Sequence, residues 1–144
     1  MNISPLLGPA AILVLWSLVV LAWLTATRLP AFNKAGISLA TAPRGARYAD
    51  VEQDMPAQVN WVSHNYTHLM EQPTIFYAVI AVLVLSGDTS GINLAAAWAY
   101  TVLRIAHSLW QGLVNVIAVR VVLFMLFTLS LWVLAINAVR RTVF

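Results

Sequence analysis

The stretch LLGPAAILVLWSLVVLAWLTAT, residues Leu6 to Thr27, decides the fold, because it holds 22 consecutive residues without a charge. At about 1.5 Å of rise per residue, a helix of this length crosses roughly 30 Å of hydrocarbon. Arg28 and Pro30 follow it and are expected to close the helix. The apolar run begins almost at Met1 and lacks a basic leader, so we predict a membrane span and no cleavable signal peptide.

The composition of the whole chain is also that of a membrane protein. Of its 144 residues, 61% are hydrophobic and only 9% are charged, well outside the range of soluble globular domains. The net charge of +3 is too sparse for a nucleic-acid surface, although it suits a small anionic ligand. There is no cysteine, which excludes a cysteine nucleophile, so any thiol chemistry must use a thiol from another molecule.

Three further helices are expected beyond the first. Asp54 and Pro56 are good start signals for the second helix, GDTSG at Gly87–Gly91 is a turn by composition, and Gln111–Asn115 is the shortest connection. We therefore predict an all-α integral membrane four-helix bundle, a single domain over residues 1–144 with spans at about 6–27, 57–86, 92–110 and 113–139 and a polar loop at 28–56.

Four spans place both chain ends on one face of the membrane. The opposite face carries the 28–56 loop and the Gln111–Asn115 connection, and we call it the loop face. More cations flank the loop face than the other face, which favours a cytoplasmic loop face under the positive-inside rule. The residues compared are Arg28, Lys34, Arg44 and Arg47 against Arg140 and Arg141.

The ionisable residues inside the predicted spans fall at one depth. Glu71 on the second span lies roughly 10 to 20 Å from the loop face, and Arg104 and Arg120 lie about 10 Å from it. A charge in the hydrocarbon is unfavourable unless it faces the bundle interior and has a partner, so we predict an ion pair between Glu71 and Arg104. Arg120 then lacks a carboxylate, and an anionic ligand entering from the loop face would supply one.

Two polar stripes are expected to face each other at this depth. They follow helical spacings of i, i+4, i+7 and i, i+3, i+7, and they comprise His64, His68 and Glu71 on the second span and Arg104, His107 and Gln111 on the third. The first stripe also has the spacing of a metal site. It lacks the H-E-x-x-H signature because Asn65 follows His64, so we predict no metal there, and a metal-dependent membrane hydrolase is the third hypothesis for function.

An ordered set of motifs connects these residues to a known family. The set is E-x-P-x-x-F in the second span, R-x-x-H in the third and an arginine early in the fourth, here Glu71, Pro73, Phe76, Arg104, His107 and Arg120. It resembles the MAPEG family, the membrane-associated proteins in eicosanoid and glutathione metabolism, and its bacterial members more than the mammalian enzymes. The resemblance covers nearly the whole chain.

The resemblance implies a homotrimer of four-helix protomers with glutathione bound between neighbouring subunits on the cytoplasmic side. The positions matching residues that hold glutathione in characterised members are Glu71, Arg104 and His107. Arg120 matches the arginine that lies beside the thiol and favours its thiolate, and we assign it the catalytic role. Glutathione itself offers two carboxylates for arginines and an ammonium group for Glu71.

The chain departs from the family pattern at four positions. His68 stands where asparagine is common, His64 where several members have arginine, and Gln111 where several active enzymes have tyrosine. Val121 follows Arg120 where one branch has a serine proposed to assist the thiol. We retain His64, His68 and Gln111 as candidate glutathione contacts at these matching positions.

Two main hypotheses for function follow. The first is an enzyme that activates glutathione as co-substrate and transfers it to a lipophilic electrophile from the bilayer, or uses it to reduce one. The alternative is a non-catalytic trimeric membrane module that binds a lipid or a partner protein, which the departures at His68, Gln111 and Val121 favour. Both place the chain as a multi-pass protein, in the cell membrane if it is bacterial, with a cytoplasmic first loop and no nucleic-acid partner.

Overall fold

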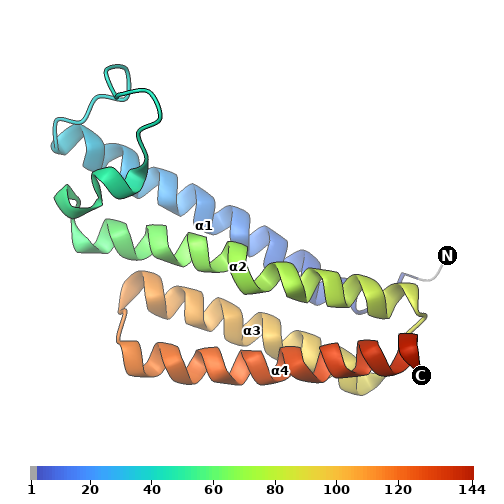
Figure 1. Cartoon of the computed structure of the whole chain (residues 1–144). Helices are drawn as coiled ribbons and strands as arrows, with labels where there is room; N and C mark the ends of the chain where they lie inside the picture. The colour runs from blue at the N-terminus through green and yellow to red at the C-terminus, as the bar shows by residue number, and fades with distance from the viewer. Residues whose placement is uncertain (1–2) are drawn as a thin grey trace.

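Four long helices make up the computed structural model, which describes residues 3–144. They are α1 (Leu7–Lys34), α2 (Ala57–Leu85), α3 (Gly91–Leu113) and α4 (Ile117–Val143), with two short 3-10 turns at Tyr48–Asp50 and Glu52–Asp54 in the first loop. Figure 1 shows the helices running along one another, with both chain ends at one end of the bundle and the long loop at the other. The predicted all-α four-helix fold is confirmed.

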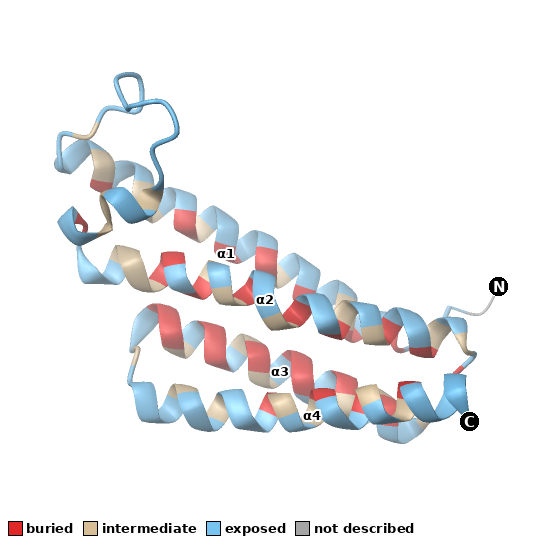
Figure 2. Cartoon of the chain, viewed as in Figure 1, coloured by how far each residue is buried: buried red, intermediate tan, exposed pale blue. Residues whose placement is uncertain are grey.

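Three of the helices, α1, α2 and α4, are long and apolar enough to cross a membrane. The exception, α3, has 23 residues, which is about 34 Å of helix and sufficient for a span. Its sequence is more polar because it carries six buried polar side chains, namely Asn93, Thr101, Arg104, His107, Ser108 and Gln111. Figure 2 shows the buried residues of α3 along its length, whereas much of α4 is exposed.

The first helix is longer than we expected. Pro30 lies inside α1, which continues to Lys34 instead of closing near residue 28. A proline removes one backbone donor, and its fixed φ is compatible with the helix that follows it. Gly36 follows the C-cap residue Ala35, and its φ of 71° is the left-handed conformation that glycine adopts without strain after a helix end.

The connection between α3 and α4 is shorter than we expected and lies later in the chain. Gln111 belongs to α3, which runs to Leu113, and only residues 114–116 separate the two helices. Asn115 has a φ of 57°, a conformation that asparagine tolerates better than most residues, and its N–H donates to the carbonyl of Trp110 at 2.7 Å. The composition at Gln111–Asn115 therefore located the turn but not its first residue.

An aromatic cluster joins α2, α3 and α4 at mid-bundle. Phe76 and Tyr100 are stacked with ring centroids 4.3 Å apart, and Phe127 meets Tyr100 edge-on at 5.7 Å. All three side chains are buried. A second contact ties α2 to α4 beside them, because the Gln72 amide donates to Thr128 Oγ1 at 3.0 Å. This cluster fixes the positions of the three helices that carry the candidate site.

Small and hydroxyl residues of α3 allow close packing against α1. The Trp16 indole N–H donates to Ser108 Oγ at 3.0 Å, and Thr101 Oγ1 donates to the carbonyl of Pro9 at 3.1 Å. Farther along α3, Gly112 lies under the ring of Trp23, where a Cβ would stand only 2.5 Å from Cη2. Close approach at small residues is a common way for membrane helices to associate.

Gly112→Ala should destabilise the protein by about 1 to 3 kcal/mol, because the new methyl group overlaps the Trp23 ring. In a Trp23→Ala background the same change should become favourable, since alanine is a better helix former than glycine by about 1 kcal/mol. Unfolding in detergent, followed by circular dichroism, measures both. Gly8→Ala is the matched control, because its Cβ would make an ordinary 3.7 Å contact. An equal cost in both backgrounds would show that the Trp23 contact is not the cause.

Candidate functional site

A cavity of about 250 Å³ opens between α2, α3 and α4 at the level where the sequence placed its ionisable residues. Its lining comprises His68 from α2, His107 from α3, and Ile117, Arg120, Val121 and Phe124 from α4. Three of the seven predicted site residues, His68, His107 and Arg120, therefore meet at one place. They come from three different helices, so the cavity depends on the packing of the bundle.

Arg104 lies behind the cavity wall and fixes the orientation of His107. Its Nη1 is 2.8 Å from Nδ1 of His107, and the two side chains are 1% and 2% exposed. A guanidinium group can only donate, so Nδ1 accepts and the imidazole carries its proton on Nε2. Phe127 supports both groups, with its ring 5.2 Å from Cζ of Arg104 and edge-on to the His107 ring at 5.4 Å.

His68 lies against the face of His107. The two rings are stacked with centroids 6.3 Å apart and an interplanar angle of 16°. The His68 side chain is half-buried and also borders the cavity. The site thus contains two nearly parallel imidazoles, one fixed by Arg104 and one at the opening.

Arg120 brings a guanidinium group to the same cavity from the first turn of α4. Its Nη1 donates to Oδ1 of Asn115 at 2.8 Å, which anchors the side chain to the α3–α4 turn. Its Nε is buried and has no hydrogen-bond partner within residues 3–144. Nε of Arg104 is likewise buried and has no hydrogen-bond partner among the described residues. These cations lack the acceptor that a carboxylate or other anion would provide.

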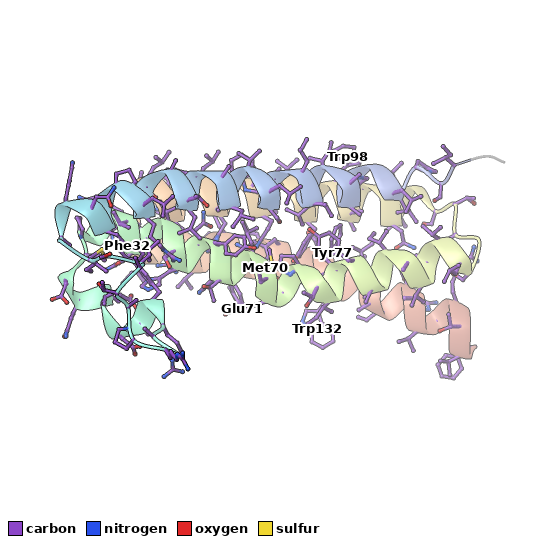
Figure 3. All side chains as sticks on the ribbon, turned by 90° about the horizontal axis from the view of Figure 1, so that it is seen from above. Phe32, Met70, Glu71, Tyr77, Trp98 and Trp132 are labelled. Carbon is purple, nitrogen blue, oxygen red and sulfur yellow. The ribbon has the colours of Figure 1, made fainter. Side chains whose placement is uncertain are left out.

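The expected ion pair between Glu71 and Arg104 is absent from the described chain. Glu71 is exposed, and Figure 3 shows it on the side of the bundle away from α1. The reason is helical phase: Glu71 follows the buried Leu69 by two residues, which turns it by about 200° around α2. The prediction that Glu71 lies on the face of α2 that packs against α3 is therefore wrong.

His64 also lies outside the cavity. Its side chain is exposed and its Nε2 pairs with the carboxylate of Glu52 in the first loop. The three residues share one side of α2, as their spacing predicts, but that side is not the one that packs on α3. Only His68, at the edge of this stripe, borders the cavity. Within residues 3–144, no group of three histidine, cysteine or acidic side chains is placed to hold a metal ion.

Gln111 is buried in α3, and Asn65 of α2 is a second buried amide that the sequence reasoning missed. Neither side chain has a hydrogen-bond partner in the described part of the chain. The ring pair of His68 and His107 shows which residues of the antiparallel helices α2 and α3 lie side by side. Asn65 is three residues before His68, and Gln111 is four residues after His107. Both therefore lie one turn closer to the loop face, at about the same level. A helical phase analysis anchored on Leu69 would have indicated Asn65 as an inward-facing residue.

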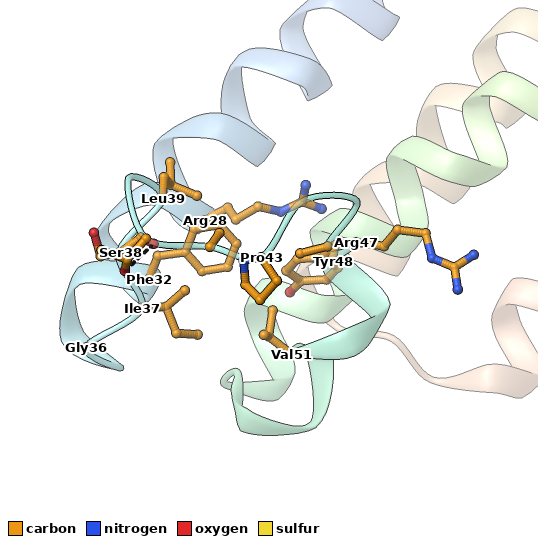
Figure 4. Close-up of a pocket in the computed structure, with 13 residues that line it drawn as sticks. Arg28, Phe32, Gly36, Ile37, Ser38, Leu39, Pro43, Arg47, Tyr48 and Val51 are labelled. Atoms are coloured by element: carbon orange, nitrogen blue, oxygen red, sulfur yellow. Dashed lines mark hydrogen bonds between the residues drawn. The ribbon is translucent and has the colours of Figure 1, made fainter.

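A second, larger cavity of about 460 Å³ lies beneath the first loop, and Figure 4 shows the residues that line it. Arg28 is central to it: its Nη2 donates to Ser63 Oγ at 2.5 Å, and its Cζ lies 3.8 Å from the centre of the Tyr48 ring. Tyr48 donates to Oδ1 of Asn60 at 2.6 Å. Burial raises the pKa of Tyr48, with Arg28 opposing the shift, so the hydroxyl stays protonated and this link between loop and α2 persists at neutral pH.

An apolar groove of about 270 Å³ runs between α2 and α4. It is lined by Gln72, Ile75, Thr128, Leu131, Trp132 and Ala135. Trp132 is 62% exposed, and Figure 3 shows it on the same side of the bundle as Glu71. The groove lies farther from the loop face than the cavity of His68, His107 and Arg120. Both α2 and α4 run away from the loop face, and the groove residues follow the cavity residues along each helix.

Comparison with known proteins gives one match. The model of the MAPEG family matches residues 6–140, which is nearly the whole chain and includes all four helices. No curated protein and no solved structure matches the chain.

Proposed function

The chain belongs to the MAPEG family and is an integral membrane protein, and from this premise we propose that it binds glutathione and transfers it to, or uses it to reduce, a lipophilic electrophile. The observation that carries the proposal is the cavity where Arg120 meets His68 and His107. It supplies positive charge and hydrogen-bond donors inside a membrane-spanning bundle. A thiol held there would ionise more readily, since a nearby cation lowers a thiol pKa from about 8.5.

The balance of charge around the cavity suits the tripeptide. Among the described residues, the buried Nε atoms of Arg104 and Arg120 have no hydrogen-bond partner, while Glu71 is exposed. Glutathione carries two carboxylates and one ammonium group, so it complements two guanidinium groups and one carboxylate. Arginine is well suited to carboxylates because its planar fork can donate two parallel hydrogen bonds.

Each residue of the site would have its own role in binding and activating glutathione. Arg120 would stabilise the thiolate, and His107 would donate its Nε2–H into the cavity. Arg104 would act through His107 by holding that tautomer, and Gln111 would support the site from behind. Glu71 and His64 lie on the outer side of α2, so they would contact glutathione only where a neighbouring copy covers that face. We therefore propose a homotrimer with glutathione between subunits and the loop face on the cytoplasmic side.

The groove between α2 and α4 supports a lipophilic second substrate. Ile75, Leu131, Trp132 and Ala135 give it an apolar wall, and a molecule dissolved in the bilayer could enter it without crossing water. The groove and the cavity of Arg120 follow each other along α2 and α4. An apolar chain in the groove would thus bring its electrophilic end toward the thiolate.

Calorimetry with glutathione tests the binding proposal directly. We expect the protein purified in detergent to bind glutathione with a dissociation constant below about 1 mM, since enzymes commonly have substrate KM values below this concentration. The same titration with S-methyl glutathione, which lacks the thiol proton, serves as a control for the carboxylate contacts. An absence of heat and of competition at millimolar glutathione would contradict the proposal and favour the non-catalytic membrane module. One observation favours that alternative: Gln111 is buried and stands where several active members have tyrosine.

A further inference from the structure

Two imidazoles border the cavity, and their hydrogen bonds differ. Nδ1 of His107 accepts from Arg104 at 2.8 Å, so protonating that nitrogen would break the bond and set two cations against each other. His107 is therefore held as a neutral donor. His68 carries no such restriction, because the histidine hydrogen bonds in the described chain involve His64 and His107 only.

We propose that the imidazole of His68 accepts the proton of the glutathione thiol, an inference that rests on the proposed function. His68 borders the cavity beside Arg120 and is stacked on His107 with ring centroids 6.3 Å apart. It is half-buried, so it is screened from bulk water and still accessible from the cavity. A base in this place separates two tasks: Arg120 stabilises the sulfur anion, and His68 takes the proton that leaves it.

The charges around His68 are compatible with this role. Arg104 and Arg120 act on it from α3 and α4, and His107 faces it; on its own helix Glu71 and His64 are within electrostatic reach. Burial of the ring favours a neutral imidazole before the thiol arrives, and the two guanidinium groups act in the same direction. Proton transfer then creates an imidazolium and a thiolate together, so the total charge of the site does not change. Glu71 and the thiolate both favour the imidazolium.

The step balances without another reactant. The S–H bond breaks, its electron pair stays on sulfur, and the proton binds a ring nitrogen of His68. The sulfur electron pair then forms a bond to the electrophilic carbon while the leaving group departs with its own bonding electrons. A basic leaving group takes the proton from His68, whereas chloride departs as the free anion and the proton passes from His68 to water. Either route restores the neutral imidazole. Proton transfer by a positioned side chain typically contributes about 100-fold or more to a rate.

His68→Phe and His68→Ala together test the proposal on the full chain. Phenylalanine keeps a ring against His107 but has no nitrogen, so kcat/KM for conjugation of a chlorinated nitrobenzene should fall about 100-fold. Glutathione affinity by calorimetry should change less than about threefold, and the ultraviolet absorbance of the bound thiolate at pH 7 should be lost or strongly reduced. Thr67→Ala, an exposed neighbour on α2, is the matched control and should keep the wild-type values.

Added imidazole separates a base from a packing residue. The His68→Ala variant has room for a free imidazole, and its rate should rise with imidazole concentration, whereas that of His68→Phe should not. Wild-type rate and thiolate absorbance in His68→Phe would overturn the inference and leave glutathione binding intact. No imidazole response in His68→Ala, with glutathione still bound, would also overturn it. A wild-type protein that binds no glutathione would instead refute the proposed function itself.

Discussion

Arg120→Ala is expected to lower kcat for glutathione conjugation about 100-fold, the usual cost of removing a group that stabilises developing charge in an active site. An unperturbed thiol of pKa about 8.5 is only about 3% ionised at pH 7, and a shift to about 6.5 would raise this to about 76%. The loss of Arg120 removes the cation on which that shift depends. The absorbance of bound thiolate as a function of pH measures the effect apart from turnover.

The controls for Arg120 isolate its charge. Arg120→Lys retains a cation but loses the fork that donates to Asn115, so it should keep part of the thiolate signal. Arg140→Ala removes an exposed arginine from the last turn of α4, far from the cavity along the helix, and should have no effect. If Arg120→Ala left the thiolate titration unchanged, the thiol would lie elsewhere in the bundle.

The depth of the site was predictable because helical rise is nearly constant. Counting residues from the loop face put Glu71, Arg104 and Arg120 near one level. In the structure Arg120 borders a cavity with His68 and His107, and Arg104 contacts His107 behind it. What residue counting cannot supply is the rotation of each helix about its axis. For α2 that rotation follows from the buried residues Leu69 and Phe76, which leave His68 half-buried at the side of the helix and Glu71 exposed.

Helix ends were the other feature that composition alone did not determine. Pro30 is a strong breaker in isolation, but α1 continues through it, with Phe32 packing on Tyr48 of the loop at 6.1 Å. Tertiary contact thus favours two more turns that local propensity opposes. Gln111 shows the same effect in α3, where packing against neighbouring helices buries a polar residue that looked like part of a turn.

The outward position of Glu71 leads to the second large effect. It lies among exposed apolar side chains of a span, with Met70 42% and Ile75 55% exposed in the single chain. A carboxylate facing hydrocarbon is unfavourable, so this face calls for a polar partner. In our proposal the partner is the ammonium group of glutathione, bound where a neighbouring copy covers α2.

Glu71→Gln should therefore weaken glutathione binding about 30-fold, or about 2 kcal/mol, the lower end of the cost of breaking a buried charge pair. An analogue of glutathione without its α-amino group should bind the wild-type protein with a similar loss. The variant should not distinguish the analogue from glutathione, because the carboxylate and the ammonium group act as one pair. Calorimetry gives all four affinities, and Asp54→Asn, an exposed acid in the first loop, is the control. If the two losses added instead of overlapping, Glu71 would bind another group, and the cation facing it would have to come from the neighbouring subunit.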